Sequence, residues 1–174
     1  MKSKTVYPRL KNIRYGCYLT FFLILFFNLS SCRSDESEGP DCSLTGANFS
    51  VSDISGNWTA TRAVFSLTAT GPVQEVDIVA EGGSATLSIQ SNGRFTLSIL
   101  EAGEPNDTSS GNLCIDIDIL VVSFDGDAPE DYDFFGIDFI QGSNNMTIGG
   151  PAEFDFNDDG TLQPANIQLD LIRS

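Results

Sequence analysis

Carboxylates are the main acid–base groups that this sequence offers for chemistry. It contains 24 aspartates and glutamates and no histidine, and its lysines all lie within the first 11 residues. A histidine general base, a Ser-His-Asp triad and a histidine-ligated zinc ion are therefore excluded. Glycoside hydrolysis by two carboxylates needs no histidine, but Asp138 is the one acid that stands out in an apolar run, and we expect it to face solvent. We therefore expect that the protein is not an enzyme.

A possible metal site is indicated by oxygen-bearing residues at alternating positions. Asp155, Asn157 and Asp159 are followed by Gly160, which matches the opening of a calcium-binding loop. The twelfth position of such a loop is Asn166 instead of a bidentate glutamate, and no helical pattern flanks it. Two interpretations stay open, a Ca²⁺ site and a solvated acidic turn. No other cofactor is expected.

The first 31 residues have the pattern of a secretory signal. Five cations precede an apolar run over residues 21–27, and small residues follow it. The run is shorter than the ~20 apolar residues that span a bilayer. Leu29-Ser30-Ser31-Cys32 also resembles the lipobox of bacterial lipoproteins. The resemblance implies cleavage before Cys32 and a thioether-linked diacylglyceryl group on that cysteine, which would anchor the protein to a membrane.

Residues 32–53 are expected to form a tether that begins at the lipidated Cys32. Residues 33–40 are polar and acidic and end in Gly-Pro, so they bury too little apolar area to offset the entropy lost on ordering. The segment also resembles the acidic export signals of surface lipoproteins in some Gram-negative phyla. That resemblance implies a lipid-anchored protein of the outer membrane that is exposed on the cell surface. A simple flexible spacer is the alternative.

Cleavage before Cys32 would leave a strongly acidic protein. Four arginines would face all 24 acidic residues, which gives a net charge of −20. Such a surface repels nucleic acid phosphates, so we expect no nucleic-acid partner. We also expect the protein to be a monomer.

Two cysteines remain beyond the signal and the expected lipidation site. In an exported chain, Cys42 and Cys114 are an even pair that favours a disulfide between the tether and a central strand. The alternative is two free thiols, one of them buried.

From about residue 54 onward, apolar and polar residues alternate with the period of two that indicates β-strands. Asn92-Gly93 between the alternating runs 85–89 and 95–99 predicts a hairpin, because both turn residues tolerate positive φ. Residues 113–122 form a further run in which the three isoleucines are expected to share one face.

Eight to nine short strands and no helical period predict an all-β domain over residues 54–174. Sequential antiparallel strands with local turns favour an eight-stranded antiparallel up-and-down barrel, because closure removes exposed strand edges. A β-sandwich is the alternative.

Residues at the two ends of this domain carry a resemblance to lipocalins. Gly56-Asn57-Trp58 opens the first strand, and Arg173 ends the last. They resemble the lipocalin Gly-x-Trp signature and the arginine of the last strand, and the chain is nearest to the short lipocalin-like domains of bacterial lipoproteins. The resemblance implies a lipocalin- or calycin-like barrel in which the guanidinium covers the Trp58 ring, a contact of about 0.5–2 kcal/mol. Gly56, Trp58 and Arg173 are expected to be structural.

The lipocalin resemblance also implies a function. Such barrels hold small apolar ligands, so we expect a membrane-anchored lipoprotein that binds or carries one at the cell surface without catalysis. The alternative is a structural or interaction protein with a filled barrel. A connected cavity of about 300 Å³ or more would favour the carrier. The residues expected to line it are Phe95, Leu97, Ile117, Ile119, Phe135, Ile137 and Phe139.

Overall fold

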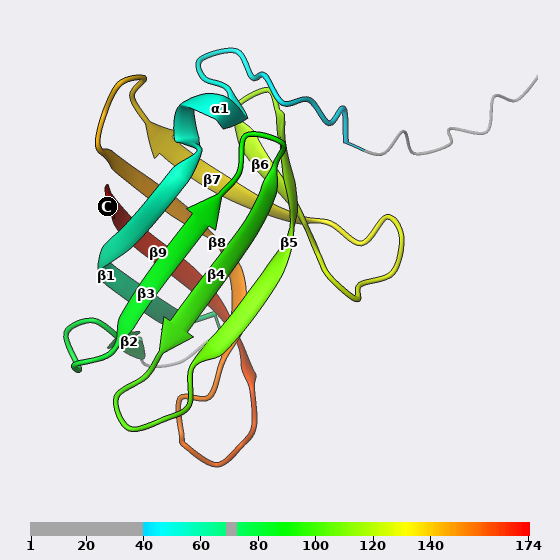
Figure 1. Cartoon of the computed structure of the whole chain (residues 1–174). Helices are drawn as coiled ribbons and strands as arrows, with labels where there is room; N and C mark the ends of the chain where they lie inside the picture. Colours follow the sequence, from blue (N-terminus) through cyan, green and yellow to red (C-terminus); the bar gives the residue numbers. More distant parts are fainter. Residues whose placement is uncertain (1–39, 69–72) are drawn as a thin grey trace, which may run out of the picture. The chain divides into compact units, whose positions relative to one another are not determined.

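The computed structural model describes residues 40–68 and 73–174, so the predicted signal and Cys32 lie outside the described residues. The described residues form one single-turn helix and nine strands (Figure 1). The elements are α1 (Val51–Ile54), β1 (Gly56–Leu67), β2 (Glu75–Asp77), β3 (Ser84–Ile89), β4 (Arg94–Leu100), β5 (Asp107–Asp116), β6 (Ile119–Phe124), β7 (Asp133–Phe139), β8 (Asn145–Phe154) and β9 (Gln163–Arg173).

The strands form a closed antiparallel barrel. From β3 to β9 each strand pairs with the next along the chain, and β1 pairs with both β3 and β9, which closes the ring. The short β2 is a ninth strand that pairs with β1 at residues 64–66, beyond the residues that pair with β3. The predicted eight-stranded antiparallel barrel is therefore confirmed, with one extra strand, and the sandwich alternative is wrong.

Alternation along the strands fills the barrel interior. In β3, Ala85, Leu87 and Ile89 are buried while the intervening hydroxyl residues are exposed. The predicted hairpin at Asn92-Gly93 joins β3 to β4, and Gly93 has the positive φ of 88° that such a turn requires. The buried side chains of the other barrel strands meet those of β3 in one core.

The prediction of one continuous strand over residues 113–122 is wrong, because these residues form a hairpin. β5 ends at Asp116, β6 begins at Ile119, and these two residues are paired across a two-residue turn. Ile117 lies in that turn with φ of 58°, an uncommon conformation for a β-branched residue. Its side chain is 75% exposed and that of Ile119 is 45% exposed. Both residues therefore lie outside the interior that they were expected to line.

Residues 43–54, expected to belong largely to the tether, pack against one end of the barrel. The main chains of Ser43 and Ile115 exchange two hydrogen bonds, of 3.0 and 2.7 Å. The predicted disulfide between Cys42 and Cys114 is confirmed, with Cα atoms 5.4 Å apart. Phe49 and Val51 are buried, so this segment is part of the core.

The same end is closed by α1 and Trp58. The indole N–H of Trp58 donates to the carbonyl of Ile54 at 2.8 Å, and the Arg173 guanidinium lies 4.3 Å from the centre of the indole ring. Arg173 also donates to the carbonyls of Asp53 (2.7 Å) and Ser55. The predicted contact between Trp58 and Arg173 is confirmed, and it ties the first strand, the last strand and α1 together.

Gly56 makes this arrangement possible. Its φ is 132°, and a Cβ at this position would lie only 2.8 Å from Nη1 of Arg173. A larger residue would push the guanidinium off the Trp58 ring. The spacing of the glycine, the tryptophan and the distant arginine therefore has a structural cause.

Candidate functional site

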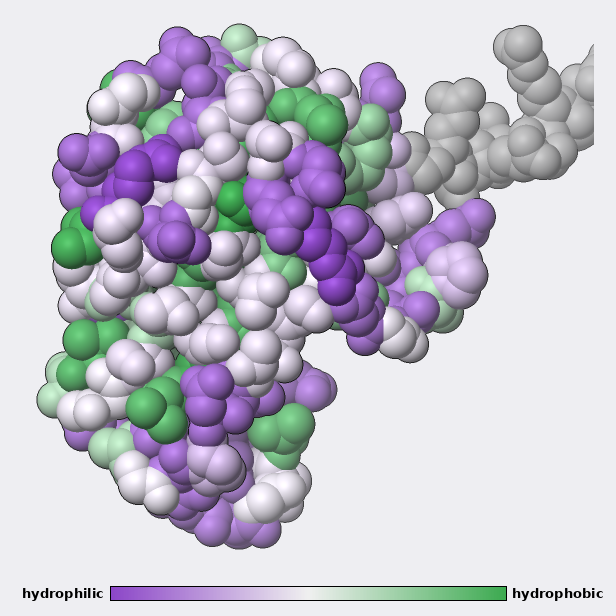
Figure 2. Space-filling model, in the orientation of Figure 1, coloured by the Kyte–Doolittle hydropathy of each residue, from purple (hydrophilic) through white to green (hydrophobic). Residues whose placement is uncertain are grey.

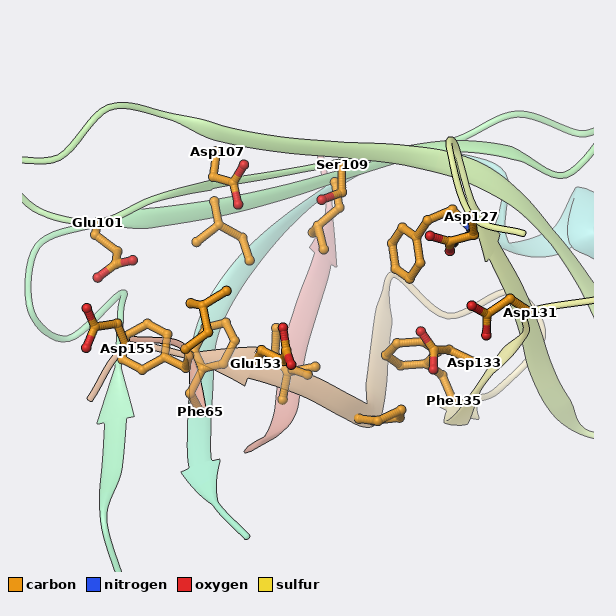
Figure 3. A pocket seen from close by; sticks show the side chains of 18 residues that line it. Phe65, Glu101, Asp107, Ser109, Asp127, Asp131, Asp133, Phe135, Glu153 and Asp155 are labelled. Carbon is orange, nitrogen blue, oxygen red and sulfur yellow. Dashed lines mark hydrogen bonds between the residues drawn. The ribbon is translucent and has the colours of Figure 1, made fainter. Parts of the chain in front are cut away.

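The end of the barrel opposite α1 (Figure 1) holds a cavity of about 680 Å³, and Figure 3 shows the side chains that line it. Its walls include the last residues of β1, β4, β6 and β8 and the first residues of β5 and β7, which the antiparallel pairing brings to one end. The lining residues are Phe65, Leu97, Ile99, Glu101, Asp107, Ser109, Phe124, Asp127, Asp131, Asp133, Phe135, Pro151, Ala152, Glu153, Phe154, Asp155, Leu162 and Ile167.

The cavity exists because inward-facing positions near this end carry small side chains. Ser109 on β5 pairs with Leu97 on β4, and Ala152 on β8 pairs with Ala165 on β9. Leu97 and Ile99 have inward positions but are only partly buried. Interior side chains of a filled barrel are covered by their neighbours, so this end of the barrel is not filled.

The floor of the cavity is apolar and largely aromatic. The rings of Phe65 and Phe154 are stacked with centroids 4.5 Å apart. Gly150 leaves room for the ring of Phe135, because a Cβ at Gly150 would collide with that ring. Rings of this kind offer a flat apolar surface to a small molecule.

A second void of about 60 Å³ lies further toward the middle of the barrel. It is lined entirely by apolar residues, and four of them (Leu97, Phe124, Phe135 and Ile167) also line the larger cavity. The void is large enough for no more than a small alkyl or aryl group. The two spaces share one wall, so a ligand in the cavity would have its deepest atoms against this apolar region.

The mouth of the cavity is acidic. Seven of its lining residues are carboxylates, and no basic side chain is among the described residues that line it. Figure 3 shows Glu101 and Asp155 on one side of the mouth and Asp127, Asp131 and Asp133 on the other. At the lower end of the molecule in Figure 2, where the loops after β4 and β8 lie, hydrophilic residues gather beside a few hydrophobic ones. A cleft lined by one sign of charge concentrates ions of the opposite sign.

Strand alternation directs some of these carboxylates inward. Asp107 has the same parity on β5 as Ser109, and Asp133 the same parity on β7 as Phe135. Partial burial, and then the charges of Asp131 and Asp127, raise the pKa of Asp133.

Glu101, which directly follows β4, is affected in the same way. Partial burial raises the pKa of its carboxyl, and the nearby charges of Asp158, Glu104, Asp155 and Glu81 raise it further. The mouth therefore holds negative charge that nothing in its described lining neutralises.

The arginines of the described residues are engaged elsewhere. Arg94 and Ser110 hydrogen-bond to the Asp125 carboxylate, and the bond from Arg94 is the main cause that lowers the pKa of Asp125 to about 2. Arg62 lies 3.6 Å from Asp170 and 3.9 Å from Asp77. Arg173 covers Trp58 at the other end of the barrel.

The residues that the sequence predicted for the cavity are scattered in the structure. Leu97 and Phe135 line it, whereas Phe95 borders only the inner void. Ile137 packs against the core, and Phe139 contacts Trp58 and Phe49 at the closed end. Ile117 and Ile119 lie outside the barrel interior. The lining residues that sequence reasoning missed include Phe65, Ile99, Phe124, Phe154, Ile167 and the acids of the mouth.

In the segment that resembles a calcium loop, the first carboxylate accepts hydrogen bonds from the main chain. Asp155 accepts hydrogen bonds from the main-chain N–H groups of Asn157 (3.1 Å), Asp159 (3.3 Å) and Gly160 (2.6 Å). Desolvation alone would raise the pKa of Asp155, but these hydrogen bonds lower it. In the part of the chain that the structure describes, no three acidic or cysteine side chains are grouped to hold a metal. Asp155 instead caps the turn between β8 and β9.

Comparison with known proteins adds no assignment. No family model matches the chain, and no curated protein matches it. Among residues 40–68 and 73–174, no helix has the length and apolar character needed to cross a membrane. The site is therefore interpreted from its own geometry.

Proposed function

We propose that this protein binds a small, largely apolar ligand in the open end of its barrel and has no catalytic activity of its own. The observation that carries the proposal is the cavity of about 680 Å³ with an apolar floor. Ligand sites in proteins typically measure about 300–1,000 Å³ and are lined mainly by apolar and aromatic side chains. The volume falls within that range, which favours the carrier over a barrel filled by its own side chains.

The apolar floor supports moderate affinity. Burying eight CH₂ groups of a ligand at about 0.8 kcal/mol each would contribute roughly 6 kcal/mol. That free energy corresponds to a Kd on the order of tens of micromolar. Apolar contacts alone would therefore hold a ligand reversibly, as a carrier requires.

The proposed location is the outer surface of the outer membrane, with the barrel anchored through a lipid on Cys32. The signal pattern and the resemblance to a lipobox support this location. The disulfide between Cys42 and Cys114 supports export, because such bonds persist in oxidising compartments. The resemblance of Gly56, Trp58 and Arg173 to the lipocalin signature supports a place among the lipocalin-like lipoproteins.

Fluorescence of the neutral apolar probe N-phenyl-1-naphthylamine tests ligand binding. We expect saturable binding to the protein with a micromolar Kd. Ser109→Phe would fill the cavity from an inward position of β5 and should weaken binding at least tenfold. Ser88→Phe is the matched control, because Ser88 is exposed on the outer face of β3. Absence of saturable binding, or equal binding by both variants, would favour the structural or interaction protein.

A further inference from the structure

The cavity combines two zones that prefer different parts of a ligand. Its floor is built from aromatic and aliphatic side chains, among them the stacked rings of Phe65 and Phe154. Its mouth carries carboxylates that include the inward-directed Asp107 and Asp133. An apolar ligand would fill the floor but leave the charge of the mouth without a counterion.

Strand register places two carboxylates of the mouth at inward positions. Asp107, which is exposed, is paired with Ile99, and Asp133, which is partly buried, is paired with Val122. Partial burial and neighbouring acids raise the pKa values of Asp133 and Glu101, because both disfavour the charged form of a carboxyl. A positive group at this position would lie among several carboxylates in a partly desolvated cleft, where charge interactions are stronger than in bulk water.

Three other ligand classes fit less well. An anion would be repelled by the mouth, and a neutral apolar molecule would not use it. A bare metal ion would not use the apolar floor, and the described residues contain no grouping of three acidic side chains suited to coordinate one. A molecule that has both an apolar body and a positive charge would use the floor and the mouth together.

We infer that the ligand of this cavity is a small organic cation, with an apolar body on the aromatic floor and a positively charged group among the carboxylates of the mouth. The inference rests on the proposed function, because it names the ligand class of the same cavity. An ammonium or guanidinium group attached to an alkyl or aryl body has this chemistry.

Three probes with the same apolar chain separate the inference from the proposed function. Octylammonium, octanol and nonanoate, which all carry an octyl chain, would each be titrated, as monomers, against the mature protein in competition with the neutral fluorescent probe. At about 20 mM salt we expect octylammonium to bind at least tenfold more tightly than octanol, and nonanoate to bind more weakly than octanol. At about 0.5 M salt the preference for the cation should shrink to a few-fold, because salt screens charge interactions.

Paired substitutions on the same two strands test where the charge acts. Asp107→Asn with Asp133→Asn removes two charges at the mouth, whereas Asp116→Asn with Asp138→Asn removes two charges from outward positions of β5 and β7. The mouth variant should lose most of the preference for octylammonium and keep its affinity for octanol. The control variant loses the same net charge but at positions outside the cavity. It should therefore change the affinity for either probe by less than about twofold.

The outcomes are distinguishable. Equal binding of octanol and octylammonium, or equal effects of the two double variants, would overturn the organic-cation inference and leave the apolar carrier intact. Failure of all three probes to bind would overturn the proposed function and the inference with it. Thermal unfolding of each variant would verify that it is folded.

Discussion

Replacing Arg173 with methionine should destabilise the closed end of the barrel. The substitution keeps an unbranched apolar stem over the Trp58 ring but removes the guanidinium. That group lies 4.3 Å from the ring centre and donates to the carbonyls of Asp53 and Ser55. Asp53 belongs to α1 and Ser55 joins α1 to β1, so the loss should loosen the packing of α1.

The size of the effect follows from these contacts. The cation–π contact contributes about 1 kcal/mol at a partly exposed site, and each of the two hydrogen bonds contributes about 1 kcal/mol net. Arg173→Met should therefore lower the free energy of unfolding by about 3 kcal/mol. Arg173→Lys keeps the charge but not the two-pronged donor geometry, and should fall between the wild type and the methionine variant.

Urea unfolding followed by Trp58 fluorescence measures these differences, because Trp58 is the single tryptophan of the chain. Arg62→Met is the matched control, since Arg62 is exposed and makes only ion pairs with the partly exposed Asp77 and Asp170. Exposed pairs contribute about 0–1 kcal/mol. If Arg173→Met were no more destabilising than Arg62→Met, the guanidinium would not hold the end of the barrel and our account of this contact would fail.

Three further predictions concern other parts of the chain. The hydrogen bond from Arg94 holds the pKa of Asp125 at about 2, below its ordinary value of 3.8, so the stability it provides is present above about pH 4 and is lost as pH falls toward 2. The difference in Tm between the wild type and Asp125→Asn should narrow over that pH range, and a constant difference would contradict the assignment. The disulfide joins cysteines that are 72 residues apart, and Cys42→Ser with Cys114→Ser would remove it. In the chain-entropy model this should lower the free energy of unfolding, measured by urea unfolding, by about 4 kcal/mol. A decrease below about 1 kcal/mol would show that the bond contributes little. Mass spectrometry of the mature protein should find an acylated Cys32, and Cys32→Ala should release the protein from the membrane fraction; an unmodified Cys32 would end the lipoprotein proposal.

Much of the fold was predictable because period-two alternation is a local property of the sequence. The hairpin at Asn92-Gly93 and the pairing of the first and last strands follow from short-range patterns and from the positions of Trp58 and Arg173. The irregularity in β1 was not predictable. Thr61 shifts the register so that Ala60 and Ala63 both pair with residues of β9 and are both buried.

The turn at Ile117 and Asp118 illustrates a different limit. An isoleucine at positive φ has no local sequence signal, and the alternation of residues 113–122 continues through the turn. Contacts from distant residues hold the turn: Ala47 donates to the carbonyl of Ile117 at 3.1 Å, and the amide of Asn48 donates to Asp118 at 2.8 Å. Long-range contacts of this kind override local preference.

An apolar cavity inside the barrel was expected from the sequence, but its position and most of its lining residues were not. Sequence reasoning assigned apolar residues at period two to the interior and all acids to the solvated surface. The mouth breaks that rule, because the inward parity of β5 and β7 continues outward to Asp107 and Asp133 at the strand ends. The available signal was that each of these carboxylates stands at the start of a strand, two residues before an inward-facing residue. Only the register of the barrel shows which end of it is open.

Native mass spectrometry of the mature protein, extracted from the membranes of its own host, tests the central claim most directly. We predict a complex with a small molecule in wild-type protein and in Ser88→Phe, and the loss of that molecule in Ser109→Phe. The organic-cation inference further predicts that the released molecule carries a positive charge at neutral pH. A wild-type protein that shows only its own lipidated mass, and binds none of the probes with an apolar chain, would contradict the claim that this barrel is a carrier.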